Sequence, residues 1–172
     1  WLVAYQPGLP LERLEPLRDT AAIVDLLGRP VASARFMGGA EHAMIAGAYG
    51  RHARPEVADA AALVAAGTMA LPSFADVGGP FPGTSGLGRI VGAVPGPGRA
   101  RAALASLYLA LMTSACLDLL HSRGQVIVEG PFAEDRLFTA LLAALRPGQR
   151  LAVSSERYGA GCGAALLWGW AG

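Results

Sequence analysis

Residues 125–145 read QVIVEGPFAEDRLFTALLAAL, and this stretch decides the fold. Gln125 to Glu129 form the short apolar run of a buried strand, and Ala133 to Leu145 carry apolar side chains at helical spacing. Between them Gly130 and Pro131 turn the chain abruptly, because glycine accepts dihedral angles that other residues avoid and proline fixes its own. A strand followed at once by a helix is typical of an α/β fold.

The same alternation continues to the end of the chain, and strands dominate its beginning. The other predicted strands are Trp1–Gln6, Thr20–Leu26, Pro30–Met37, Thr68–Leu71, Arg89–Val94 and Arg150–Ser154. The other predicted helices are Gly39–Tyr49, Pro55–Ala66, Arg99–Ser122 and Gly159–Trp170. Leu27-Gly28-Arg29 is predicted to be a hairpin turn. We therefore expect one α/β domain over residues 1–172, in the order βββαβαβα, with a mixed sheet and helices on both of its faces.

The composition narrows the function classes. With 172 residues the chain is long enough to form one sizeable core. Hydrophobic residues make up 53% of it and charged residues only 16%, and this composition excludes intrinsic disorder. A net charge of +1 gives no electrostatic basis for a nucleic-acid partner. All 14 basic residues are arginines, so a Walker-type phosphate loop, a Schiff-base lysine and a lysine general base are excluded.

Two features bear on the cellular setting. Cys116 and Cys162 lie far apart inside apolar helical patterns, which predicts two buried free thiols in a reducing, cytoplasmic protein. Residues 102–120 are long and apolar enough for a membrane span, but polar residues such as Ser106 interrupt them. We expect a buried helix there and no membrane partner. The start at Trp1, inside a predicted strand, indicates a piece of a longer protein.

The turn after residues 125–129 is the best candidate for a ligand site. In open α/β sheets, ligands bind at the carboxyl ends of strands, where helix N-termini present unpaired N–H groups. Gly130 has no side chain to hinder a planar ligand, and Pro131 has no N–H to donate to a phosphate. Asp135 can cap the helix or accept a hydrogen bond from a ligand. On local chemistry alone, an ordinary strand-to-helix connection is the simpler interpretation.

Other motifs favour structural roles. Gly78 to Gly88 (GGPFPGTSGLG) is rich enough in glycine for a phosphate cradle, but it does not join a strand to a helix. We expect a structural or lobe-contacting loop, with Phe74 and Phe81 exposed on it for a partner. No metal site is predicted, because the histidines His42, His52 and His121 lack metal-ligand spacing.

Isolated charged and aromatic residues are interpreted in the same way. Arg18 and Arg35 are expected to form salt bridges with neighbours such as Asp19 and Glu41. Of Trp168 and Trp170, one is expected in the core and the other at a lobe or subunit contact. The aspartates expected in solvated turns or caps, rather than in catalysis, are Asp19, Asp25, Asp76 and Asp118.

Several segments together resemble the C-terminal half of the FGGY carbohydrate kinases. That half has a strand, a Gly-Gly-x-Ala-x-Asn turn, an amphipathic helix, a strand, and then Gly-x-x-x-Gly-Ala-Ala. The similar segments here are Val126–Asp135, Leu137–Leu145, Leu151–Ser154 and Gly159–Leu166. Segments that resemble the fuculokinase-like branch are Arg35–Gly39 (RFMGG) with Glu41, and Leu104–Met112 (LASLYLALM).

The resemblance implies an actin-like, ribonuclease-H-like ATPase fold in which this turn contacts adenine and ribose. Carried over residue by residue, the nucleotide-binding positions are Gly130, Pro131, Phe132, Ala133 and Asp135. Pro131 stands where the family has a second glycine, which narrows access to the backbone. Asp135 stands where the family has asparagine, so a carboxylate, which only accepts hydrogen bonds, replaces an amide, which also donates them. The implied cofactors are ATP and Mg²⁺, with the magnesium held mainly through the nucleotide and an N-terminal lobe.

The resemblance also implies functional parts that lie outside this chain. The family's phosphate-holding Gly-Thr-Gly-Thr loop precedes a tryptophan that corresponds to Trp1, and the aspartate that acts as general base on the sugar belongs to the N-terminal lobe. No catalytic residue is therefore expected in this chain. We expect the C-terminal lobe of a kinase that transfers the ATP γ-phosphoryl group to a ketose or polyol, fuculose-like sugars included.

Alone, such a lobe is expected to be inactive, and a homodimer is the candidate assembly. The alternative is a non-catalytic actin-like module for oligomerisation or regulation, with a degenerate nucleotide site.

Overall fold

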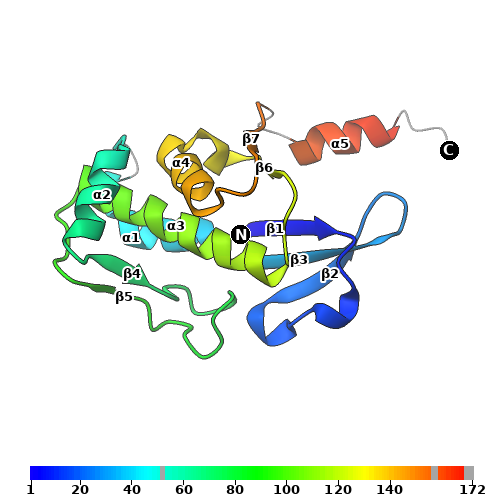
Figure 1. The fold of residues 1–172 in the computed structure, drawn as a ribbon, viewed down its shortest axis with the longest axis horizontal. Helices are drawn as coiled ribbons and strands as arrows, with labels where there is room; N and C mark the ends of the chain where they lie inside the picture. The colour runs from blue at the N-terminus through cyan, green and yellow to red at the C-terminus, as the bar shows by residue number, and fades with distance from the viewer. Residues whose placement is uncertain (51–52, 156–158, 169–172) are drawn as a thin grey trace.

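The computed structural model describes residues 1–50, 53–155 and 159–168 (Figure 1). It begins with three antiparallel strands, β1 (Leu2–Pro7), β2 (Thr20–Val24) and β3 (Pro30–Phe36), in the order β1-β3-β2. Two short 3₁₀ helices, η1 (Leu11–Arg13) and η2 (Pro16–Arg18), lie between β1 and β2. The three predicted strands are confirmed.

The predicted hairpin turn between β2 and β3 is also confirmed. Gly28 adopts a φ of 73°, which glycine reaches without steric strain. Asp25 Oδ1 accepts hydrogen bonds from the backbone N–H groups of Leu27 and Arg29, each at 2.9 Å. These bonds hold the pairing of β2 with β3 in one register.

Two helices follow the sheet. α1 (Gly38–Gly50) bends at Gly47, whose φ of 68° interrupts the helical dihedrals. α2 (Val57–Ala65) begins after a capping box in which Glu56 and Asp59 each accept the other's backbone N–H. The helix therefore starts two residues beyond Pro55 rather than at that proline, and the predicted start was wrong.

A second antiparallel pair of strands follows α2 along the chain. β4 (Met69–Leu71) and β5 (Arg89–Val91) pair antiparallel and are joined by residues 72–88. This loop is held by its own backbone, because Ser73 N–H donates to Thr84 O at 3.2 Å and Gly88 N–H donates to Ser73 O at 2.8 Å.

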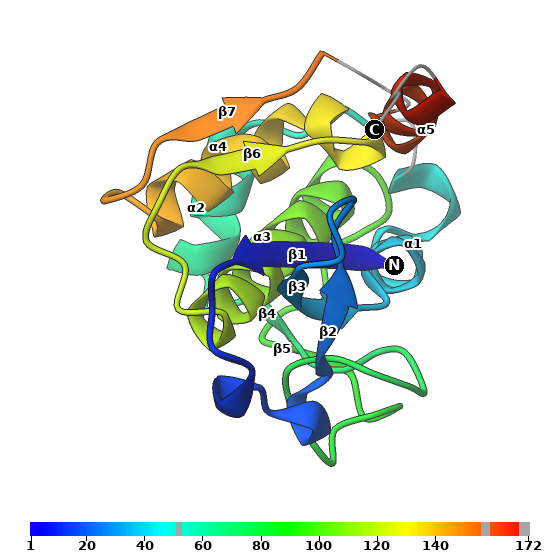
Figure 2. The ribbon, with the colours of Figure 1, turned by 90° about the vertical axis from the view of Figure 1, so that its right-hand side faces the viewer.

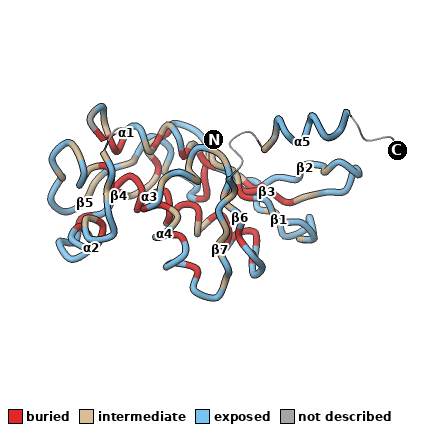
Figure 3. The backbone as a smooth tube through the Cα atoms, turned by 90° about the horizontal axis from the view of Figure 1, so that it is seen from above, coloured by how far each residue is buried: buried red, intermediate tan, exposed pale blue. Residues whose placement is uncertain are grey.

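The core forms around α3 (Arg99–Leu119), which packs against α1, α2 and α4 and contacts β1, β3 and β4. Figure 3 shows the buried residues gathered along α3 and the elements around it. By length and composition α3 could cross a membrane, yet 78% of its most apolar window is buried inside the fold. Burial of this helix follows the prediction.

The C-terminal part contains β6 (Val126–Val128), η3 (Pro131–Glu134), α4 (Arg136–Leu145), β7 (Leu151–Val153) and α5 (Gly159–Trp168). β6 and β7 pair in parallel. α4 begins at Arg136 instead of Ala133, because Asp135 caps it and residues 131–134 form a 3₁₀ turn. α5 extends from the body of the domain (Figure 1), and its Leu166 and Trp168 are 76% and 96% exposed.

The sheet differs from the single mixed sheet that was predicted. The described strands form three separate sheets, β1-β3-β2, β4-β5 and β6-β7, and the element order is βββααββαβαβα. β6 lies above β1 in both Figure 1 and Figure 2, but no ladder of hydrogen bonds joins them in the described part of the chain. Within the described ranges, no strand pairs with the edge of β1 away from β3 or with the edge of β6 away from β7.

Candidate functional site

A pocket of about 890 Å³ lies between the α1–α2 connection and the turn that precedes α4. Its base is formed by Ala102 and Ser106 of the buried helix α3. The stretch that was singled out in the sequence therefore faces a concave surface. The residues that line the pocket are His42, Gly50, Ala53, Arg54, Pro55, Glu56, Val57, Ala58, Ala102, Ser106, Pro131, Phe132, Glu134, Asp135, Arg136 and Leu137.

Asp135 joins the turn to the core helix. One oxygen, Oδ1, accepts the backbone N–H of Phe138 at 3.0 Å and caps α4. The other, Oδ2, accepts the hydroxyl of Ser106 at 2.7 Å, and Ser106 is only 1% exposed. Both carboxylate oxygens are thus engaged within the protein. Asp135 holds η3 and the start of α4 against α3, whatever else it contacts.

An aromatic contact shapes the wall of the pocket. The ring of Phe132 meets that of His42 edge-on, with centroids 5.7 Å apart, and it packs at 6.0 Å against the buried Phe138. Burial lowers the pKa of His42, and the negative charge of Asp135 opposes this shift. His42 is therefore a neutral imidazole near pH 7, with one N–H donor and one acceptor nitrogen.

The structure brings three of the five predicted nucleotide residues to this pocket, namely Pro131, Phe132 and Asp135. Gly130 and Ala133 form the turn but do not line the pocket. Gly130 needs its lack of side chain for its φ of 78° rather than for space, because a Cβ there would meet nothing within 4 Å. Its carbonyl accepts the N–H of Ala133 at 3.0 Å.

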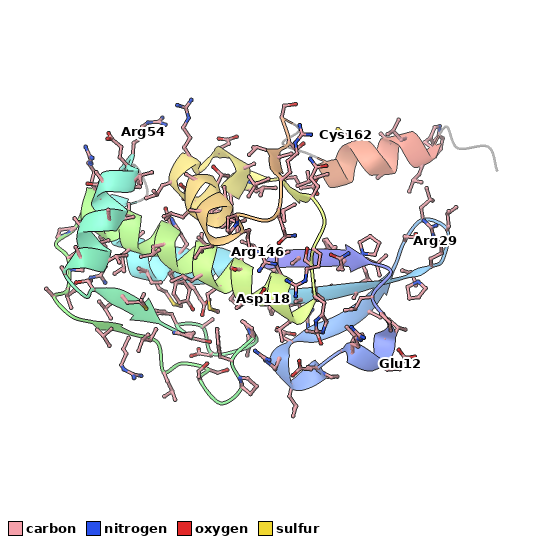
Figure 4. All side chains as sticks on the ribbon, in the orientation of Figure 1. Glu12, Arg29, Arg54, Asp118, Arg146 and Cys162 are labelled. Atoms are coloured by element: carbon pink, nitrogen blue, oxygen red, sulfur yellow. The ribbon has the colours of Figure 1, made fainter. Side chains whose placement is uncertain are left out.

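Charged side chains surround the pocket mouth. Arg54 precedes α2 and Arg136 opens α4, and both are exposed. Figure 4 labels Arg54 at the α2 end of the molecule. Among the described residues neither arginine forms an ion pair, whereas Glu56 lies 3.7 Å from Arg99 and caps α2. The rim also carries the exposed carboxylates of Glu56 and Glu134, so an anionic group of a ligand would have to lie on the side of the two arginines.

The glycine-rich loop 78–88 is structural. Gly79 N–H donates to Asp19 Oδ2 at 3.1 Å, and Arg18 Nε donates to Pro80 O at 3.0 Å. Gly86 N–H donates to Ala75 O at 2.8 Å, so the loop uses these donors internally and does not offer them to a phosphate.

The two phenylalanines of this region differ in environment. Phe74 is half-buried and packs edge-on against Tyr108 with centroids 5.6 Å apart, so the prediction that it is exposed was wrong. Phe81 is 36% exposed.

Most of the aspartates have structural partners. Asp19 Oδ1 accepts from Arg35 Nε at 2.9 Å, as predicted, and Asp25 stabilises the β2–β3 turn. Asp118 forms an ion pair with Arg146, which reaches from the end of α4 to α3 (Figure 4). Asp118 is therefore more than a solvated cap.

Two other expected ion pairs take a different form. Arg18 lies 3.6 Å from Glu15, a residue that was not named as its partner. The buried Glu41 accepts the backbone N–H of Ala75 at 3.0 Å.

Of the remaining sequence predictions, some are confirmed and others are wrong. Cys116 is buried, and burial raises the pKa of its thiol to about 12. Cys162 is exposed on α5, so the prediction that it is buried was wrong. Trp168 is exposed, so it is not the tryptophan of the pair that was expected in the core, while His52 and Trp170 lie outside the described residues. Among the residues that are described, no group of three His, Cys, Asp or Glu side chains could hold a metal ion.

The pocket residues that sequence reasoning missed include His42, Ser106 and Arg54. Ser106 did leave a signal, since it is a polar residue inside an otherwise apolar helix, and its bond to Asp135 explains it. His42 and Arg54 left none, because their place in the pocket depends on how α1 and α2 pack against α4.

Comparison with known proteins identifies the family. The chain belongs to the family described as carbohydrate kinase FGGY, C-terminal domain, whose profile matches residues 1–172. It is also similar to the crystal structure of a carbohydrate kinase from Novosphingobium aromaticivorans, with a TM-score of 0.71 and 36% sequence identity. The match covers 89% of this chain and 32% of that one, so the chain spans about a third of the length of that kinase. The search of curated proteins found no match. The resemblance to the FGGY family is thereby confirmed.

Proposed function

We propose that this chain is the actin-like, nucleotide-binding C-terminal lobe of an ATP-dependent sugar kinase. In the whole protein, the lobe would bind ATP while an N-terminal lobe holds a ketose or polyol, fuculose-like sugars included, for transfer of the γ-phosphoryl group. Phosphoryl transfer depends mainly on positioning and charge neutralisation, and closure of two lobes over a nucleotide supplies both.

The pocket at the turn before α4 is the observation that carries this proposal. It is concave, about 890 Å³ in volume and bordered by Pro131, Phe132 and Asp135, which are three of the positions that the family resemblance assigns to adenosine. A pocket of that size suits a small organic ligand. The half-exposed ring of Phe132 offers a face or edge for a base, and the exposed guanidinium groups at the rim offer charge for an anion.

Magnesium would enter with the nucleotide. Carboxylate-bound Mg²⁺ is usually shared with substrate phosphates, and this lobe needs to contribute little to it. The residues of the pocket fit the nucleoside part of ATP rather than a metal ion, because the carboxylate of Asp135 is already engaged by Ser106 and by Phe138.

The test is a titration of the isotope-labelled chain with ATP or ADP, followed through the backbone amide signals. We expect shifts concentrated at residues 130–135 and at His42. Phe132→Ala should weaken binding by at least about fivefold, since stacking of a base on an aromatic ring contributes about 1–3 kcal/mol. Phe81→Ala is the matched control, because Phe81 lies on the separate glycine-rich loop and should leave binding unchanged.

The opposite result would favour the alternative function. If saturating nucleotide moves no amide signal around the pocket, the chain is better described as a non-catalytic module for oligomerisation or regulation. Engagement of both Asp135 oxygens within the protein is the observation that favours this alternative.

A further inference from the structure

The two buried or half-buried side chains that join the turn to α3, Ser106 and Asp135, are already bonded to protein groups. The Ser106 hydroxyl donates to Asp135 Oδ2, and Asp135 Oδ1 accepts the N–H of Phe138. The arginines of the rim can only donate, and the carboxylates of Glu56 and Glu134 are exposed. Among the described side chains of the pocket that are at least half-buried, His42 is the remaining one that can accept a hydrogen bond.

His42 has hydrogen-bonding capacity that no described protein group uses. It projects from α1 into the pocket lining, is half-buried and meets the ring of Phe132 at a centroid distance of 5.7 Å. No described residue makes a hydrogen bond to its ring nitrogens, and neither nitrogen is among the fully buried atoms that lack a partner. The ring nitrogens therefore keep their hydrogen-bonding capacity for a ligand.

The charge state of His42 suits an acceptor role. Burial lowers the pKa of the imidazole, so one ring nitrogen carries a lone pair near neutral pH. The carboxylate of Asp135 acts in the other direction but does not reverse the shift.

We propose that His42 determines base recognition, with one of its ring nitrogens accepting a hydrogen bond from the 6-amino group of an adenine that lies against Phe132. This inference rests on the proposed nucleotide site and assigns the residue that reads the base in it. Adenine offers an amino donor at this position, and the half-buried imidazole beside Phe132 offers the acceptor. A neutral hydrogen bond of this kind changes affinity by about two- to tenfold.

The experiment compares ATP with purine riboside triphosphate, which lacks only the 6-amino group. Dissociation constants are measured by calorimetry for the unaltered chain, for His42→Phe and for His42→Gln. Phenylalanine keeps an aromatic ring against Phe132 but cannot accept a hydrogen bond, whereas the glutamine amide oxygen can. Far-ultraviolet circular dichroism melts establish that each variant is folded.

We expect the unaltered chain to bind ATP about two- to tenfold more tightly than the purine analogue. His42→Phe should bind the two nucleotides about equally, and His42→Gln should regain part of the preference for ATP. A second readout needs no variant, because the ring nitrogen signals of His42 should shift with ATP and much less with the purine analogue.

Three outcomes would overturn the proposal in distinguishable ways. An ATP preference that survives in His42→Phe removes the role of His42 but keeps the nucleotide site. Equal binding of the two nucleotides by the unaltered chain shows that the amino group is not read at all. Failure of the unaltered chain to bind either nucleotide refutes the nucleotide site itself, and the role of His42 falls with it.

Discussion

The bond between Asp135 and Ser106 provides the sharpest test of how the pocket is built. Removing the carboxylate with Asp135→Ala takes away the cap of α4, which contributes about 1 kcal/mol. It also leaves the Ser106 hydroxyl, 1% exposed, without an acceptor, which costs a further 1–3 kcal/mol or so. We therefore expect Asp135→Ala to lower the free energy of unfolding by about 2–4 kcal/mol.

The companion changes separate the two contributions. Ser106→Ala removes the donor and should cost about 1–2 kcal/mol, because Asp135 is only half-buried and water can replace part of the bond. The double variant should cost about 1–2 kcal/mol less than the sum of the two single changes, since the second removal has no bond left to break. Asp135→Asn keeps a cap and an acceptor, and it should cost less than about 1 kcal/mol.

Urea unfolding followed by circular dichroism measures the four variants and the unaltered chain under the same conditions. If the single changes add to within about 0.5 kcal/mol in the double variant, Asp135 and Ser106 are not coupled. The account of Asp135 as the link between the turn and α3 would then be refuted.

Three further predictions concern packing, pH and reactivity. Gly38→Ala should destabilise the fold by about 1–3 kcal/mol, because its Cβ would lie 2.8 Å from a side-chain carbon of β1. Gly39→Ala is the control, since a Cβ there meets open space, and it should be neutral or stabilising by up to about 1 kcal/mol. Equal melting temperatures of the two variants would contradict this prediction. The pKa of His42 is lowered in the folded state, so the unfolded chain takes up this proton first as the pH falls. Its contribution to stability should therefore decline below about pH 6.5. Urea unfolding at neutral and mildly acidic pH should show a smaller decline for His42→Phe, and equal declines would count against the shift. Iodoacetamide at mildly alkaline pH should modify the exposed Cys162 in the folded chain and spare Cys116, whose thiol is buried with a pKa of about 12; mass spectrometry of the peptides decides the outcome.

Local patterns in the sequence were enough to predict the kinds of secondary structure but not all of their limits. Apolar periodicity places α3 and the strands of the first sheet because side-chain spacing is a local property. The start of α4 depended on which residue caps it, and Asp135 does so through a side-chain bond that spacing does not reveal. Separation of the strands into three sheets could not be predicted either, since pairing is decided by contacts between distant segments.

The residues of the candidate site could likewise be predicted only in part. The segment from Gly130 to Asp135 could be found because a glycine and a proline at the end of an apolar strand are visible in the sequence. The partners that complete the pocket, His42 and Ser106, come from α1 and α3 and reach it only through tertiary packing. Carrying over a family's site residues position by position cannot find such residues, because their place in the pocket depends on how the helices pack against one another.

The outer edges of β1 and β6 carry an implication for handling the chain in solution. No described strand pairs with either edge, and a strand edge without a partner is a template for strand addition between molecules. Neither edge strand contains a lysine, the residue that most often discourages this pairing. Sedimentation at increasing protein concentration should accordingly reveal self-association, and ligand titrations are best interpreted only below the concentration at which it begins.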